Sequence, residues 1–196
     1  MASIVFADIE GFTRLSESLP PAEVIGVLNS FFGAATAIID ARGGIVVNHV
    51  GDGLIAAFNA PLPVDGHAAR AVDAARALFG LVAERGFERH RLRLRIGIAT
   101  GPVAAGTVGG AERQTYTLYG DAVNLAQRLQ ELTKEFETDC LISGATFETA
   151  RSGCADAVAI GSVPVRGREA PADVFALGGA FRTARSDGAL LARSRS

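Results

Sequence analysis

The feature that most constrains this chain is a pair of short apolar runs joined by a tight glycine turn. Residues 45–50 and 54–58 are rich in aliphatic side chains, and only Gly51, Asp52 and Gly53 separate them. Runs of this length are typical of strands, and a glycine-rich acidic turn between them is typical of a β-hairpin. The pattern predicts two neighbouring antiparallel strands with a carboxylate at the tip of their turn.

Apolar periodicity on either side of the hairpin indicates the other elements of the fold. Residues 4–7 form a short apolar run that ends on Asp8, as in a buried strand. Residues 21–42 and 66–85 repeat apolar side chains at helical spacing. Residues 91–98 alternate arginine with aliphatic residues, which predicts a half-buried strand whose arginines form a solvated face. This order of elements predicts an α+β sandwich of the ferredoxin-like split βαβ type.

The second half of the chain is predicted to hold one more long helix and several short elements. Residues 121–134 carry a leucine stripe at helical spacing, and short strands with one short helix starting near Ser143 are expected up to about residue 178. We expect residues 1–181 to form a single domain and the polar, aperiodic residues 182–196 to form a mobile tail.

Composition argues against several kinds of partner. The 19 Lys and Arg residues nearly balance the 21 Asp and Glu residues, without a block of like charge, so we expect no nucleic-acid partner. Cys140 and Cys154 lack metal or redox spacing and are expected to be reduced core residues of a cytoplasmic protein. No apolar run approaches the roughly 20 residues of a membrane helix, and no signal sequence is present. We therefore expect no membrane partner for this chain.

Two carboxylates mark a candidate metal site. Asp8 ends the first predicted strand and Asp52 occupies the hairpin turn, 44 residues further along the chain. If the two strands are adjacent in the centre of the sheet, both carboxylates reach the same edge. Hard oxygen ligands of this kind suit Mg²⁺ or Mn²⁺. The sequence therefore predicts a divalent cation site at that edge.

Four segments in a fixed order carry a family resemblance. They are FADIEGFTRLSE (residues 6–17), VGDG (50–53), RIGIATGPVAAGTVG (95–109) and YTLYGDAVNLAQRL (116–129). Together they resemble the catalytic domain of the class III adenylate and guanylate cyclases, from about residue 3 to residue 178. The resemblance implies the class III fold and a cyclisation reaction. In that reaction the 3′-hydroxyl of a nucleoside triphosphate attacks its own α-phosphorus, which gives a 3′,5′-cyclic monophosphate and pyrophosphate.

The resemblance also implies roles for residues near the N-terminus. Asp8 and Asp52 match the family's two metal aspartates. Ile9 is expected to be a third metal-binding position. Two Mg²⁺ or Mn²⁺ ions per site would lower the pKa of the attacking hydroxyl and neutralise charge on the triphosphate. The segment that matches the family's phosphate cradle, through its backbone N–H groups, consists of Glu10, Gly11, Phe12 and Thr13.

Other matches fall in the second half of the chain. Asn124 matches the residue that orients the ribose, and Arg128 matches the one that stabilises the transition state. Arg166 stands where the family commonly has a lysine that contacts the triphosphate. In the family these groups face the metal aspartates across a head-to-tail dimer, so the resemblance implies a homodimer with shared active sites.

The positions that match the family's base-reading residues hold Asn48 and Thr117, whereas a lysine is usual at the first of them. A lysine only donates hydrogen bonds, but an asparagine amide both donates and accepts. We therefore expect ATP to be favoured over GTP with relaxed selectivity. A guanylate or dual-specificity cyclase is the alternative.

Two alternative functions differ from that of an active class III cyclase. The first is a catalytically weak cyclase-like module that binds nucleotide or regulates a partner; Asn48 favours it, whereas the complete set of matched site residues argues against it. The second is another two-metal enzyme such as a diguanylate cyclase, whose GG(D/E)EF signature is absent from this chain.

Overall fold

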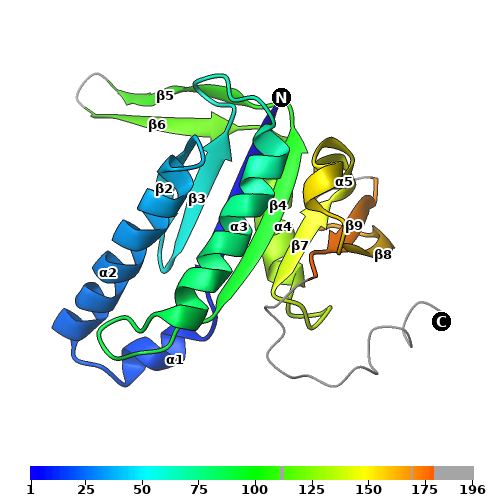
Figure 1. Ribbon diagram of the computed structural model, residues 1–196. Coiled ribbons are helices and arrows are strands. Elements are labelled where there is room, and N and C mark those ends of the chain that lie inside the picture. Colours follow the sequence, from blue (N-terminus) through cyan, green and yellow to red (C-terminus); the bar gives the residue numbers. More distant parts are fainter. Residues whose placement is uncertain (111–112, 169, 179–196) are drawn as a thin grey trace.

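A seven-stranded sheet forms the centre of the protein (Figure 1), which we describe from a computed structural model covering residues 1–110, 113–168 and 170–178. The strand order is β2-β3-β1-β4-β7-β9-β8. Its strands are β1 (Ala2–Ile9), β2 (Gly44–Val50), β3 (Gly53–Phe58), β4 (Leu94–Gly101), β7 (Cys140–Ser143), β8 (Val158–Val163) and β9 (Ala172–Ala176). The tail predicted at residues 182–196 lies outside the described residues.

Helices cover both faces of this sheet. They are α1 (Phe12–Glu17), α2 (Pro21–Asp40), α3 (His67–Glu84), α4 (Asp121–Leu132) and α5 (Gly144–Thr149), with a 3₁₀ turn η1 at Arg151–Gly153. Helices α2 and α3 bury one face of the sheet, and α4 buries the other. The elements β1, α2, β2, β3, α3 and β4 follow the split βαβ order, with β1 paired antiparallel to both β3 and β4. The predicted fold class is confirmed.

Helix α4 lies directly on strand β4 because Gly97 has no side chain. A Cβ atom at Gly97 would lie 2.1 Å from the carbonyl oxygen of Ala126 and 2.4 Å from the backbone nitrogen of Gln130. Both distances are far below van der Waals contact, so only glycine permits this approach. The position of α4 relative to the centre of the sheet is therefore closely fixed.

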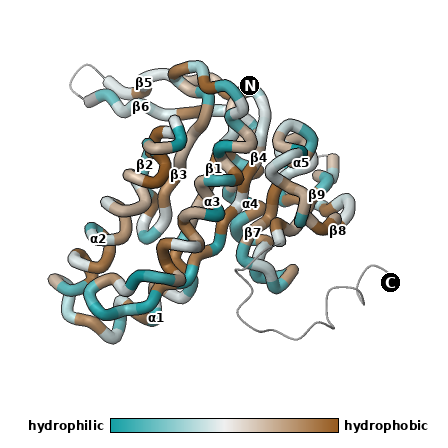
Figure 2. Tube along the Cα trace, viewed as in Figure 1, coloured by the Kyte–Doolittle hydropathy of each residue, from teal (hydrophilic) through white to brown (hydrophobic). Residues whose placement is uncertain are grey.

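Helix α2 is more apolar than the sequence interpretation allowed. Its 20 residues are long and apolar enough to cross a membrane, by length and composition only, so the statement that no apolar run approaches that length is wrong. Figure 2 shows brown, apolar stretches along it. Its buried residues Val27, Phe31, Ala35 and Ile39 pack in the core beneath the sheet. A helix of a folded core passes the same test, and in this structure α2 packs one apolar stripe against the sheet while its other residues are partly or fully exposed.

Two predictions about the region around β4 need correction. The strand begins at Leu94 instead of residue 91. The prediction that the arginines of this strand face solvent is wrong for Arg95. Its side chain is only 17% exposed and is ion-paired with Glu10. The reason is that α4 covers this face of the sheet, so an arginine there needs a buried partner.

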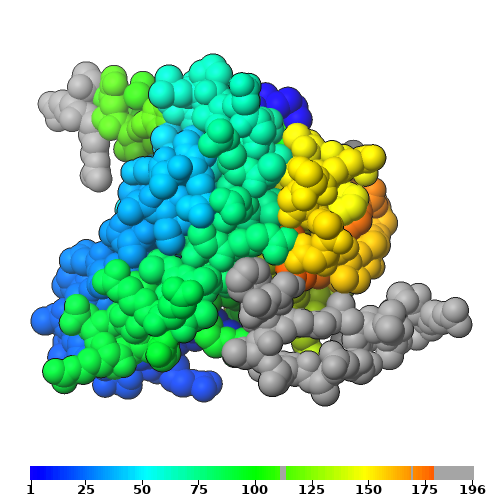
Figure 3. Space-filling view, viewed as in Figure 1, coloured from blue at the N-terminus to red at the C-terminus, as the bar shows by residue number. Residues whose placement is uncertain are grey.

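A two-stranded ribbon was not predicted. Strands β5 (Ala104–Gly110) and β6 (Arg113–Tyr119) pair antiparallel outside the main sheet. Figure 3 shows the ribbon protruding from the body of the molecule. Every residue of β5 is exposed, so it lacks the apolar alternation by which a strand is recognised.

The two cysteines are free and buried, as predicted. Burial raises the pKa of both thiols, Cys140 and Cys154, which keeps them protonated and unreactive.

Candidate active site

The structure brings the two predicted metal aspartates to one edge of the sheet. Asp8 is the penultimate residue of β1, and Asp52 lies at the tip of the β2–β3 hairpin beside it. A Cβ atom at Gly53 would lie 2.9 Å from the carbonyl oxygen of Ala7 and 3.3 Å from Asp8 Oδ1. Glycine at this position therefore lets the hairpin tip approach the end of β1 closely.

The electrostatics of the acidic pair are unfavourable in the absence of a cation. Burial, and then the nearby negative charge of Asp52, raise the pKa of Asp8 from 3.8 to about 6, against the attraction of Lys134 and Arg95. Burial also raises the pKa of Asp52, although a backbone hydrogen bond opposes the shift. A divalent cation between the carboxylates would remove this cost, because it favours the charged form of both groups.

The donors present fit a cation that arrives with a nucleotide. In the part of the chain that the structure describes, no three His, Cys, Asp or Glu side chains cluster to form a complete protein cage. Mg²⁺ is commonly held by one or two carboxylates plus substrate phosphates. The side chain of Ile9 is buried in the core and apolar, so this residue can offer only its backbone carbonyl.

The predicted phosphate turn follows directly after β1. Gly11 adopts a left-handed conformation with φ of 72° and begins α1, which explains the glycine. Among the described residues, no backbone carbonyl accepts a hydrogen bond from the N–H groups of Gly11, Phe12 or Thr13. These three N–H groups therefore remain free for an anion.

Glu10 does not fit its predicted role in that turn. Its backbone N–H donates to the carbonyl of Arg93 at 2.8 Å and is not available to a phosphate. Its carboxylate pairs with Arg95 at 2.5 Å and with Arg93 at 3.1 Å. Glu10 therefore anchors the turn to β4, and its predicted phosphate contact stays a prediction that its engaged backbone N–H does not support.

The predicted catalytic residues lie on the outer face of α4. Asn124 is exposed, and Arg128 pairs with Glu131 of the same helix at 2.8 Å. Ala126 and Gln130, on the opposite side of the helix, face β4. In a single chain the body of α4 thus separates Asn124 and Arg128 from Asp8.

Arg128 and Arg166 line one small cavity of about 170 Å³. Glu131, Leu132, Glu135 and Val165 complete its wall. Arg166 is exposed in the turn after β8, so two arginines from separate elements line this cavity. Paired guanidinium groups suit the oxygens of a phosphate chain.

A bulge in β2 orients the predicted base-reading residue. Pairing with β3 shifts between Val46 and Asn48, so that Asn48 lies opposite Ile55 and His49 opposite Leu54. The His49 ring packs against Phe32 of α2, with ring centroids 4.3 Å apart and ring planes tilted by 47°. Since neighbouring strand residues point to opposite faces, Asn48 lies on the face away from α2.

Thr117 lies on β6, opposite Gly106, and its side chain is half-buried. Strands β6 and β2 lie against each other (Figure 1), so the ribbon brings Thr117 toward the strand that carries Asn48.

Comparison with known proteins decides the family. Residues 1–178 match the family model of the adenylate and guanylate cyclase catalytic domain. The chain belongs to this family. Adenylate cyclase 1 of Rhizobium meliloti (strain 1021) is 33% identical to this cyclase domain over 186 residues, which cover 91% of the chain and 27% of that protein. The chain therefore spans about a quarter of that relative's length.

Solved cyclase structures share the fold of this domain. The guanylyl cyclase Cya2 is 32% identical with a TM-score of 0.79, and the match covers 91% of both chains. The adenylyl cyclase CyaB from P. aeruginosa is 28% identical with a TM-score of 0.77, over 94% of this chain and 96% of that one. One of these relatives is titled a guanylyl and the other an adenylyl cyclase, so the fold does not select the base.

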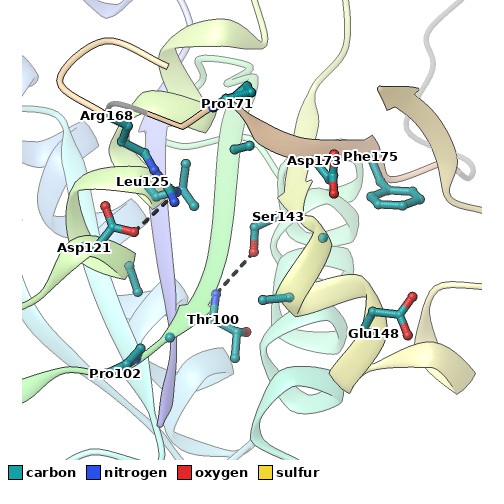
Figure 4. Close-up of a pocket in the computed structure, with 15 residues that line it drawn as sticks. Thr100, Pro102, Asp121, Leu125, Ser143, Glu148, Arg168, Pro171, Asp173 and Phe175 are labelled. Carbon is teal, nitrogen blue, oxygen red and sulfur yellow. Dashed lines mark hydrogen bonds and ion pairs between the residues drawn. The ribbon is translucent and has the colours of Figure 1, made fainter. Parts of the chain in front are cut away.

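A larger cavity of about 390 Å³ lies at the other end of α4 in this cyclase domain (Figure 4). Asp121 and Arg168 form an ion pair of 3.3 Å at its wall, and the Ser143 hydroxyl accepts a hydrogen bond from the Thr100 N–H at 3.4 Å. None of the residues matched to the family's site lines this cavity. Of the candidate site residues, Arg128 and Arg166 line the smaller cavity instead.

One polar contact in the cyclase site was missed from sequence. Gln130 is buried and its side-chain N–H donates to Asp8 Oδ2 at 3.3 Å. A signal was available, because Gln130 continues the apolar stripe of Ala122, Ala126 and Leu129 on the buried face of α4. A buried polar side chain on an otherwise apolar helix face requires a partner.

Proposed function

We propose that this domain converts ATP to 3′,5′-cyclic AMP and pyrophosphate as a homodimer with two shared active sites. The observation that carries the proposal is the half-buried pair Asp8 and Asp52, whose pKa values are both raised even though Lys134 and Arg95 attract Asp8. Class III cyclases use divalent metal ions. A pair of this kind fits two Mg²⁺ or Mn²⁺ ions that arrive with the triphosphate.

The chain's own residues have distinct tasks in this reaction. Asp8 and Asp52 would hold the cations, which supply a lower pKa for the 3′-hydroxyl and neutralise charge on the pyrophosphate. The free N–H groups that follow Gly11 would bind phosphate oxygens. As the O3′–Pα bond forms and the bond to pyrophosphate breaks, Arg128 would stabilise the negative charge that develops.

Two further residues would orient the substrate. Asn124 lies one helical turn before Arg128 on the exposed face of α4, where its amide would position the ribose. Arg166 would hold the triphosphate beside Arg128, since both side chains line the same cavity.

A second copy of the chain is needed to complete each site. Arg128 and Arg166 lie outward of α4, and Asp8 lies beneath it, so one chain does not bring the two groups together. In a two-fold dimer, Asp8 and Asp52 of one chain would meet Asn124, Arg128 and Arg166 of the partner, and both sites would be equivalent.

The preference for ATP rests on the base-reading positions. Asn48 and Thr117 both donate and accept hydrogen bonds, so neither adenine nor guanine leaves these groups unpaired. The similarity to an adenylate cyclase over most of this chain favours ATP. The similarity to Cya2 makes GTP the alternative substrate.

The test is to offer ATP, GTP, CTP and UTP separately with Mg²⁺ or Mn²⁺ and to identify the products by mass. Cyclic AMP is expected as the main product, with detectable cyclic GMP from GTP. Dominance of cyclic GMP would overturn the adenylate assignment. If a folded dimer gave no cyclic product, the domain would instead be a nucleotide-binding module without turnover.

Replacing Asn48 with lysine is expected to sharpen the preference for ATP. A lysine ammonium donates to the acceptor N1 of adenine, but it faces the N–H donor at N1 of guanine. The ratio of kcat/KM for ATP to that for GTP should rise about 10-fold or more. Asn29→Lys, at an exposed position on α2, is the matched control. An unchanged ratio in Asn48→Lys would mean that Asn48 does not contact the base.

A further inference from the structure

The buried side chain of Gln130 makes a direct contact with the metal-site carboxylate. It is 5% exposed, and its Nε2 lies 3.3 Å from Asp8 Oδ2. A carboxylate only accepts hydrogen bonds, so the amide must present its N–H to Asp8. A buried amide needs a hydrogen-bond partner, and the Asp8 carboxylate supplies one.

The backbone around Gln130 is held in place by close packing. Gly97 of β4 lies against the backbone nitrogen of Gln130 and the carbonyl of Ala126, with no space even for a methyl group between them. On the same strand pair, Asp8 of β1 lies opposite Arg95 of β4. The amide and the carboxylate are therefore carried by elements that cannot slide relative to one another.

The two oxygens of Asp8 have different surroundings. Oδ2 receives the amide of Gln130, whereas Oδ1 lies on the side of Gly53 at the hairpin tip. Asp52 precedes Gly53 in that hairpin and raises the pKa of Asp8. The bond to Oδ2 thus leaves Oδ1 on the side of the hairpin that carries the second carboxylate, as a shared cation requires.

We propose that Gln130 is a positioning residue for the cation site: its amide holds the Asp8 carboxylate so that Oδ1 faces Asp52. The proposal rests on the proposed cyclase function for the identity of the cation, and it assigns no contact between Gln130 and substrate. Groups that orient a metal ligand typically contribute about 10- to 100-fold in metal affinity.

The test compares Gln130→Met with Gln127→Met in the full chain. Methionine has a similar volume and no donor, so it keeps the packing and removes the bond to Asp8. Gln127 lies on the same helix, and its amide also donates to a carboxylate at 3.3 Å, that of Glu131 on the exposed side. It therefore provides a matched control.

Gln130→Met is expected to raise the Mn²⁺ concentration for half-maximal turnover about 10- to 100-fold, while kcat at saturating Mn²⁺ changes much less. Affinity for Mn²⁺ in the presence of 3′-deoxy-ATP, which lacks the attacking hydroxyl, should fall by the same factor in electron paramagnetic resonance titrations. Gln127→Met should bind Mn²⁺ as the unsubstituted chain does.

Wild-type Mn²⁺ affinity in Gln130→Met would overturn the proposal. So would an equal loss of kcat at every Mn²⁺ concentration together with a lower Tm, because that result indicates a purely structural role. If Gln130→Met does not fold, the proposal is tested instead by the side-chain amide NMR resonances of the unsubstituted chain. Those of Gln130 should shift on addition of Mg²⁺ and 3′-deoxy-ATP, and the absence of a shift would overturn the proposal. A chain that makes no cyclic product but shows these binding effects would overturn the cyclase function alone.

Discussion

Asp8→Asn is expected to abolish nucleotide cyclisation and at the same time to stabilise the metal-free fold. Turnover should fall on the order of 1,000-fold or more, because asparagine binds a divalent cation poorly and the cation contributes several kcal/mol of transition-state stabilisation. Asparagine has nearly the shape of aspartate, so the sheet edge and the contact with Gly53 are preserved. Loss of activity with gain of stability would mark the carboxylate as functional and not structural.

The stability gain follows from the raised pKa of Asp8. In the folded chain the pKa is about 6, against 3.8 for the unperturbed group. The folded state thus binds the proton more tightly, and stability falls as the pH rises from about 4 through 6. Asp8→Asn removes this penalty. The free energy of unfolding in EDTA should rise by up to about 3 kcal/mol above pH 7, an upper limit because solvent screens a partly exposed group.

Denaturation with urea between pH 4 and pH 8 measures this effect. The two proteins should be equally stable near pH 4, where Asp8 is largely protonated, and should diverge as the pH rises. Asp65→Asn, which removes an exposed carboxylate, is the control and should change neither turnover nor stability. An Asp8→Asn chain that keeps its activity, or that is less stable at neutral pH, would contradict the assignment of Asp8 to a cation site.

The centre of the fold could be predicted because periodicity and turn chemistry agree there. The hairpin around Asp52 has glycine on both sides of one acidic residue, and its register follows from the short turn. Once β1 pairs with β3, the approach of Asp8 to Asp52 is a consequence of strand order. The acidic pair was therefore accessible from sequence even without a family resemblance.

Other features could not be predicted, because they depend on contacts between residues that are distant in the sequence and periodicity does not reveal such contacts. Alternation places Arg95 on one side of β4, but it does not say that α4 covers that side or that Glu10 supplies the counter-charge. The same gap applies to Glu10, because its backbone N–H donates to the carbonyl of Arg93, a residue far along the chain that directly precedes β4. A local motif identifies a turn, whereas long-range pairing decides which of its N–H groups remain free.

The ribbon and the contact between Gln130 and Asp8 were missed for different reasons. The β5 segment is rich in glycine and alanine and buries none of its residues, so it has no alternation to detect. Gln130 did stand on a buried helix face, but its partner lies 122 residues away. Sequence indicates that such a side chain needs a partner without saying which one.

The placement of Arg128 on the outer face of α4 predicts that dimers of two different inactive variants regain activity. Asp8→Ala and Arg128→Ala chains should each be nearly inactive alone. In a shared-site dimer, mixing them one to one should restore about a quarter of the unsubstituted activity, because half of the dimers are mixed and each has one complete site. Turnover of ATP after the chains are denatured and refolded together measures the recovery.

A chain carrying both substitutions provides the decisive control. When it pairs with an unsubstituted chain, one site lacks Asp8 and the other lacks Arg128, so a shared-site dimer is inactive at both. Excess doubly substituted chain should therefore suppress the activity of the unsubstituted chain almost completely. If each chain instead held a whole site, the unsubstituted chain would keep its activity in the mixed dimer. Suppression by the double variant together with recovery from the single variants follows only if α4 of one chain acts on the carboxylates of the other. Persistence of activity in the presence of excess double variant would show that Asp8 and Arg128 act within one chain, despite the helix that separates them.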